Sequence, residues 1–248
     1  MKKLIAIAFL LLCGLCAGLP CEAQYVPTTL SAQQHGGGAT PSVYQYCINS
    51  NFGTSVTCAN FSVGSLQNGD LLVAWGFAST GVTLTTTVSG CSLTWTTINT
   101  GSPSSGTAFF ATAPITSTAS CTGASRPAIS GSGSSENITI EVVELQNVVN
   151  TVDGTPGYAS NSSSGNFSGP STTTTVNGDM VLAFSFAPST TAYTVNSPFT
   201  TFYAASLLGS YYQTMANEVQ SSSGAINAAY TYSGSLQGFT TAIIALKP

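Results

Sequence analysis

The chain has 248 residues, of which only 5% are charged, and four Lys or Arg against eight Asp or Glu give a formal net charge of −4. Nucleic acids and anionic lipid surfaces are bound by clusters of basic side chains, so this composition excludes both as partners. Ser, Thr, Asn and Gln must therefore keep the surface hydrated.

The first residues predict a cleavable signal peptide. Two lysines follow Met1, an apolar run extends from Leu4 to about Leu19, and Ala23 supplies the small residue that a signal peptidase requires. The run is short for a membrane span. We therefore expect residues 1–23 to be removed and the mature protein to be secreted, extracellular or periplasmic, without a membrane anchor.

Residues 24–41 predict a flexible lead-in to the folded domain, because the stretch AQQHGGGATP is polar, rich in glycine and without periodicity. His35, the only histidine, lies in it. A serine or cysteine hydrolase would depend on this imidazole as its base, which disfavours that class. We interpret His35 as a solvated side chain and expect neither a metal nor a cofactor.

The predicted mature chain keeps four cysteines, namely Cys47, Cys58, Cys91 and Cys121. An even number in an exported chain predicts two disulfides, and four cysteines permit three pairings. Turn residues in the segment INSNFGTSVT favour a hairpin that joins Cys47 to Cys58, which leaves Cys91 for Cys121. Zinc is disfavoured because the cysteines lack close CxxC spacing.

From Ser42 onward the sequence is typical of an all-β protein. Short runs rich in Val, Ile, Thr, Tyr and Phe are separated by Gly, Ser, Asn and Pro clusters at intervals of roughly ten residues. We expect residues 42–248 to form a single two-sheet β-sandwich, jelly-roll-like in topology. Strands are expected at residues 42–48, 54–62, 70–78, 82–88, 93–98, 107–113, 138–146, 171–176, 179–187, 199–206, 210–219, 225–232 and 238–246.

The most informative feature is an internal repeat of one strand motif, NGDLLVAWGFAS at residues 68–79 and NGDMVLAFSFAP at residues 177–188. Side chains alternate between the two faces of a strand, so each motif has one bulky face and one face of smaller groups. We expect both motifs to lie buried together in one interior. The bulky positions are Leu71, Val73, Trp75 and Phe77 in the first motif and Met180, Leu182, Phe184 and Phe186 in the second.

The Asn-Gly pair that opens each motif predicts a tight turn. In this interpretation Asp70 and Asp179 accept hydrogen bonds from nearby backbone amides. A calcium site is the alternative, although calcium takes six to eight oxygen ligands and neither motif has a second acid nearby. The low-complexity residues 159–175 between the motifs predict a long exposed loop, with an interdomain linker as the alternative.

Four segments follow one another along the chain: GDLLVAW, then ITIEVVELQNV with VDGT, then GDMVLAF, and finally SSSGAINAAYTYSGSLQGFTTAIIALKP. Their order resembles a broad group of secreted bacterial β-sandwich domains, over residues 43–248. The resemblance implies a jelly-roll or immunoglobulin-like sandwich of the kind attached to cell-surface, adhesive or carbohydrate-active proteins. The chain departs from the pattern by its four cysteines and by Gly238 and Phe239, where a tryptophan commonly stands.

A pair of carboxylates, as in glycoside hydrolysis, is the remaining route to catalysis. Glu141 and Glu144 lie three apart on one predicted strand, so they point to opposite faces and either would have to pair with Glu218. The segment NEVQSSSGA around Glu218 loosely resembles the acid-bearing strand of jelly-roll xylanases. The alternative, which we favour, makes all three structural residues at rims or strand ends.

Aromatic side chains offer a non-catalytic route to function. Flat rings cover the apolar faces of sugars while hydroxyl and amide groups satisfy the sugar hydroxyls. The expected ligand-binding residues are Tyr193, Tyr203, Tyr211 and Tyr212. The sequence thus predicts a secreted, non-catalytic binding or adhesion protein for carbohydrate or another extracellular polymer. A glycoside hydrolase and a structural surface subunit are the alternatives.

Overall fold

A computed structural model describes residues 39–117, 119–161, 166–189, 191–207, 211–232 and 239–248. The predicted signal peptide, most of the predicted lead-in and His35 lie outside these residues. Apart from one 3-10 turn at Gly123–Ser125, every regular element in the described residues is a strand, so the all-β prediction is confirmed. No helix in this part of the chain has the length and apolarity to cross a membrane.

The strands fall into a first half, residues 42–146, and a second half, residues 157–246. The first half contains β1 (Ser42–Gly53), β2 (Ser55–Thr57), β3 (Ser65–Leu66), β4 (Leu71–Ser79), β5 (Val82–Ser89), β6 (Thr96–Gly101), β7 (Gly106–Pro114), β8 (Ala119–Ser120), β9 (Ala128–Gly133) and β10 (Glu136–Gln146). The second half contains β11 (Gly157–Asn161), β12 (Phe167–Thr173), β13 (Asp179–Ala187), β14 (Thr194–Val195), β15 (Thr200–Leu207), β16 (Tyr211–Gln220), β17 (Ala225–Thr231) and β18 (Phe239–Leu246).

Each half has one five-stranded inner sheet and one three-stranded outer sheet. The first inner sheet has the order β1-β10-β4-β7-β6 and the second has the order β11-β18-β13-β16-β15. The outer sheets have the orders β2-β9-β5 and β12-β17-β14. Strands at matching places in the chain thus occupy matching places in the sheets, so the two halves share one strand order, to which the first half adds the short ribbon β3-β8.

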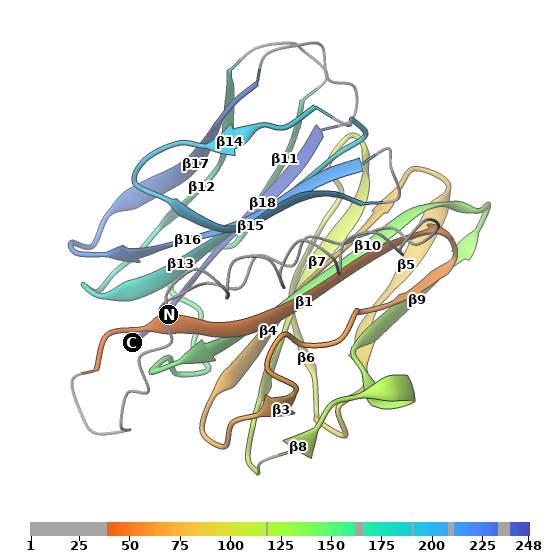
Figure 1. Cartoon of the computed structure of the whole chain (residues 1–248). Helices are drawn as coiled ribbons and strands as arrows, with labels where there is room; N and C mark the ends of the chain where they lie inside the picture. The colour runs from red at the N-terminus through yellow and green to blue at the C-terminus, as the bar shows by residue number, and fades with distance from the viewer. Residues whose placement is uncertain (1–38, 118, 162–165, 190, 208–210, 233–238) are drawn as a thin grey trace, which may run out of the picture.

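The two inner sheets face each other and enclose a central layer, and the outer sheets cover their far sides (Figure 1). The bulky faces of the repeated motifs meet in the central layer. Trp75 and Phe184 have ring centroids 5.9 Å apart, and Phe77 and Phe186 have centroids 5.3 Å apart. The prediction that both motifs lie buried in one interior is confirmed.

The smaller faces of the repeated motifs turn away from the central layer, each toward its own outer sheet. On β4, a Cβ atom on Gly76 would come within 2.3 Å of the Phe109 ring, so the glycine lets that ring lie flat on the strand. At the matching position of β13, Ser185 bonds the hydroxyls of Tyr193 and Thr214. The number of sheets expected from the sequence was therefore wrong, because each inner sheet needs cover on both sides.

Both disulfides lie in the core between the first inner and first outer sheets. Cys47 is bonded to Cys58 and Cys91 to Cys121, with Cα–Cα distances of 5.7 and 4.7 Å. The predicted pairing is confirmed. The core of the second half has no cysteine and is filled instead by a cluster of rings, which comprises Phe167, Tyr193, Tyr212, Tyr230, Tyr232 and Phe239.

Several strands occur where the sequence predicted none, among them β9, β11 and β14. The segment 159–175, expected as an exposed loop, contains the end of β11 and all of β12. Strands β9 and β11 are rich in Ser, Gly and Asn, so they lack the apolar alternation that marks a strand in the sequence, and β14 has only two residues. Their hydrogen bonds come from more apolar neighbours, as β11 pairs with β18 and β12 with β17.

Two matching polar clusters tie the halves together across the central layer. In the first, Gln213 of β16 donates hydrogen bonds to the hydroxyls of Ser50 and Thr139, which also bond each other. In the second, Ser105 bonds Ser160 and Thr240. Ser50 and Thr139 are direct cross-strand partners, as are Ser160 and Thr240, so the second half repeats the hydroxyl pair of the first. These clusters fix how one half sits on the other.

Replacing Trp75 by alanine tests the central layer. Because Trp75 is fully buried between the inner sheets, we expect its truncation to lower the free energy of unfolding by about 3–5 kcal/mol in urea titrations. Trp95, the second tryptophan, is only half-buried at the first outer core, so Trp95→Ala serves as control and should cost less. An equally small loss of unfolding free energy in both variants would contradict the burial of Trp75 between the inner sheets.

Candidate functional site

The three glutamates of the proposed catalytic pair lie in different layers. Glu141 is fully buried and faces the central layer, in the same row as Thr139 and Val143. Glu144 points to the opposite face of β10, as the sequence predicted. On β16, Val219 packs in the central layer, so Glu218 points to the far side of the second inner sheet. The structure therefore does not bring Glu218 together with either of the other two.

Glu144 belongs to a buried hydrogen-bond network that fixes the segment before β4 in place. Its carboxylate accepts hydrogen bonds from the Gln67 amide at 2.7 Å and from the Gln45 side chain at 2.5 Å. Gln45 in turn accepts from the amides of Val63 and Gly64. Burial raises the pKa of Glu144 to about 7, against these hydrogen bonds and with a further contribution from Asp70. The role of Glu144 is to fasten residues 63–67 to the sheet.

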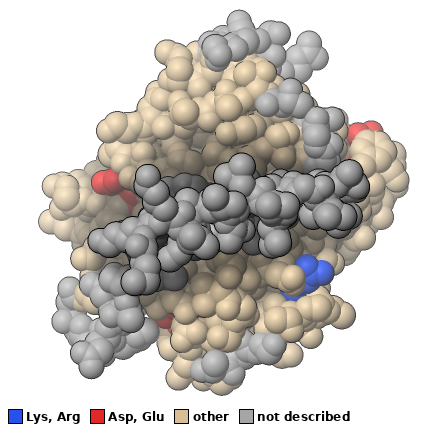
Figure 2. Space-filling view, in the orientation of Figure 1, with Lys and Arg blue, Asp and Glu red and all other residues tan. Residues whose placement is uncertain are grey.

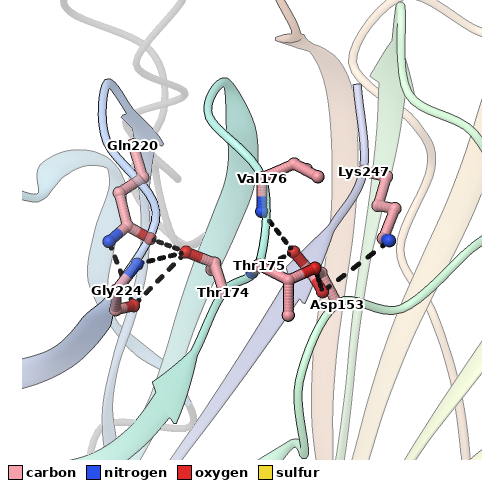
Figure 3. A network of polar contacts seen from close by, with 7 residues as sticks. All are labelled: Asp153, Thr174, Thr175, Val176, Gln220, Gly224 and Lys247. Carbon is pink, nitrogen blue, oxygen red and sulfur yellow. Dashed lines mark hydrogen bonds and ion pairs between the residues drawn. The ribbon is translucent and has the colours of Figure 1, made fainter.

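Asp153, which the sequence did not single out, anchors the segment between the halves. It accepts hydrogen bonds from the Thr175 amide at 2.6 Å, the Thr175 hydroxyl at 2.7 Å and the Val176 amide at 3.2 Å, and Lys247 lies 3.9 Å away (Figure 3). Although burial opposes ionisation, these hydrogen bonds and one from Asp179 hold the pKa of Asp153 well below its usual range. Nearby, Thr174 bonds Gln220 and Gly224 and so fixes the turn after β16.

The aspartates of the two repeated motifs are buried against other carboxyl groups. Gly69 and Gly178 adopt the positive φ expected of the turns. Within the part of the chain that the structure describes, the buried carboxyl of Asp179 has no backbone-amide partner. The carboxyl of Asp179 lies close to that of Asp153, and the carboxyl of Asp70 lies close to that of Glu144. Burial, together with the hydrogen bond and charge of Asp153, raises the pKa of Asp179 to about 7, whereas Lys247 lowers it. Each motif thus begins at an aspartate that lies next to a second carboxyl group.

The described residues contain no group of three or more His, Cys, Asp or Glu side chains arranged to hold a metal ion. The calcium interpretation of the repeated motifs requires six to eight oxygens around the ion. At Asp153 the oxygens already accept protein hydrogen bonds. The carboxyl pairs are better described as hydrogen-bonded structural elements.

The four tyrosines expected to bind ligand do not share one surface. Tyr193 is only 3% exposed, and its hydroxyl donates to the carbonyl of Tyr212 at 3.1 Å. Tyr212 packs edge-on against Tyr193 in the second outer core, whereas Tyr211 stacks on Phe186 in the central layer. Burial raises the pKa of Tyr193 well above its usual value. Tyr193 is therefore a core residue and was wrongly expected to contact a ligand.

Tyr203 takes part in a half-exposed aromatic group that the sequence did not reveal. Its ring centroid lies 5.5 Å from that of Tyr46, and the Phe202 ring lies 5.7 Å from Tyr46. The register of β15 against β16 shifts between Thr201 and Tyr203, and this bulge allows two consecutive rings to share a face. We call Tyr46, Phe202 and Tyr203 the edge cluster, since β1 and β15 are edge strands of the two inner sheets.

The surface of the described residues has few charged groups. Five of the seven acids that follow the predicted cleavage site are buried, namely Asp70, Glu141, Glu144, Asp153 and Asp179. On the face in Figure 2, coloured charged atoms occur only as a few small, separate patches.

Comparison of the chain with protein-family models, with curated proteins and with solved structures finds no match. The comparisons thus add no residue and no function to the site.

Replacing Asp179 by asparagine tests whether Asp179 and Asp153 share a proton. The pKa of Asp179 is raised when the protein is folded, so the protonated acid contributes stability at low pH that is lost as pH rises through about 7. Glu144 also has a raised pKa, so its contribution to stability changes with pH in the same direction. The lowered pKa of Asp153 contributes stability only at pH values above the usual titration range of an aspartate. We expect the urea concentration at the unfolding midpoint of the wild type to decrease as the pH is raised from about 5 to about 8.

An asparagine amide can donate to Asp153 at every pH, so Asp179→Asn should flatten this decline. Glu136→Gln, at a half-exposed acid on β10, is the control and should follow the wild type. A decline as steep in Asp179→Asn as in the wild type would show that the carboxyl pair does not share a proton.

Proposed function

We propose that the chain is a secreted, non-catalytic binding or adhesion protein that recognises carbohydrate or another uncharged extracellular polymer at the edge cluster. The observation that carries this proposal is the set of three partly buried rings on two neighbouring edge strands. Rings at this degree of exposure offer apolar faces to a ligand while their other faces remain packed. Tyrosine adds a hydroxyl that can bond a sugar hydroxyl.

The sparse surface charge supports a neutral ligand. Nucleic acids and anionic lipids would need a basic patch, and the chain has only Arg126 and Lys247 after the predicted cleavage site. Glycans without charged groups are bound by stacking and by hydrogen bonds from neutral side chains. The two disulfides fit the oxidising compartment of an exported protein.

The edges of the sheets support a separate binding protein more than a subunit of a polymer. Exposed edge strands pair with other chains unless they are short, charged or bulged. The long edge strands β1, β5, β6, β12 and β15 each have a break in register, whereas the unbroken edges β2, β11 and β14 have at most five residues. Central pairs such as β4 with β10 are regular. Because the chain has few charged side chains, bulges in the edge strands hinder their pairing with other chains.

We further propose that each half is a jelly-roll-type sandwich. The short ribbon β3-β8 is left aside here. In both halves the first and last strands are then adjacent in the inner sheet, and the second and second-last strands are adjacent in the outer sheet. Such nested pairing arises when one long antiparallel hairpin folds over, so that its strand pairs lie alternately in the two sheets of a jelly roll.

A glycan array with the oxidised mature protein tests the binding function, followed by calorimetric titration of the best ligand. Tyr46→Ala and Phe202→Ala should weaken that ligand about five- to tenfold, the effect of losing one ring contact. Phe52→Ala is the matched control. Phe52 is 60% exposed on the same strand, but six residues from Tyr46 it lies about 20 Å away, so its loss should leave affinity unchanged.

Equal melting temperatures for the three variants would show that their folds are intact. Absence of any bound glycan on the array, or equal affinity of all three variants, would remove the edge cluster as a carbohydrate site.

A further inference from the structure

Glu141 is the least expected residue of the central layer. It is fully buried, and neither carboxyl oxygen has a hydrogen-bond partner among the described residues. Burial raises the pKa of Glu141 well above its usual value and so favours the neutral acid. A neutral carboxyl still offers one O–H donor and one carbonyl acceptor, and each costs free energy if it stays unbonded.

The fold itself does not require an acid at this position. Glu141 lies directly opposite Trp75 on β4, and in the second half Ala242 lies directly opposite Phe184 on β13. Trp75 and Phe184 are matching residues of the repeated motif. Alanine thus fills the matching position of the second half. The acid therefore serves something other than the packing of the sheet.

Other buried polar atoms of the central layer also have no hydrogen-bond partner in the described part of the chain. Among them are the indole nitrogen of Trp75 and the amide oxygen of Gln213. Trp75 is the cross-strand neighbour of Glu141. The amide nitrogen of Gln213 bonds Thr139 at 2.7 Å, and Thr139 precedes Glu141 by two residues on the same face of β10. Three side chains with unsatisfied polar atoms, from β4, β10 and β16, thus face the same central layer.

We propose that Glu141, Trp75 and Gln213 form an internal site that holds one or two ordered water molecules between the two halves. The donors and acceptors balance. The Trp75 N–H and the neutral Glu141 O–H are donors, whereas the Glu141 carbonyl and the Gln213 oxygen are acceptors. A water molecule accepts two hydrogen bonds and donates two, which matches this set, and buried waters bind where such groups face one another.

A high-resolution crystal structure of the mature protein tests the site directly. We expect solvent density within hydrogen-bond distance of at least two of the three side chains. In solution, the indole proton of Trp75 should show magnetisation transfer from a long-lived water. A site without density, or a direct contact between Glu141 and Gln213, would overturn the proposal.

Two variants give a readout that simple packing would not produce. Glu141→Gln keeps a donor and an acceptor, so it should retain the water and the urea midpoint of the wild type. Glu141→Met has a similar length but is apolar, and it should displace the water and lower the midpoint, because the Trp75 N–H and the Gln213 oxygen stay unbonded. In a dry site the methionine would instead raise the midpoint, since it removes a buried polar group. A higher midpoint for Glu141→Met would therefore contradict the proposal.

Discussion

The packing of two matched strand faces against each other constrains the whole molecule. β4 and β13 each have bulky side chains on one face and small ones on the other. Because the bulky faces cover one another in the central layer, the small faces still need cover, and each half supplies its own outer sheet. Four layers follow from this one contact. The edge cluster exists only because the same contact brings β1 alongside β15.

The distribution of charge gives this body its chemical character. Acids that would ordinarily lie at the surface are buried as hydrogen-bonded groups that fasten segments of the chain, as Glu144 and Asp153 do. Their burial leaves an outer surface of hydroxyls, amides and a few rings. A surface of this kind suits neutral, hydroxyl-rich ligands, and it removes the charges that usually protect sheet edges, so bulges serve there instead.

The sequence predicted the β-class, the burial of the repeated motifs and the cysteine pairing, because apolar alternation and even cysteine numbers reflect local rules. It predicted the outer strands β5 and β17, but it missed β9 and β14 and the first part of β12. Strand β12, for example, reads FSGPSTT and is held by β17 rather than by its own propensity. The edge cluster was hidden for a similar reason, since Tyr46 and Phe202 are far apart in the chain and a bulge determines which way Phe202 points. Tyr193 looked like a surface ring because its neighbours in sequence are polar, although its neighbours in space are aromatic.

Differential scanning calorimetry of the oxidised mature protein tests the shared central layer most directly. If the two halves depend on one interior, they unfold together, and the calorimetric enthalpy equals the van't Hoff enthalpy of a single transition. Two separable transitions, or a calorimetric enthalpy well above the van't Hoff value, would mean that each half folds alone and would contradict the account.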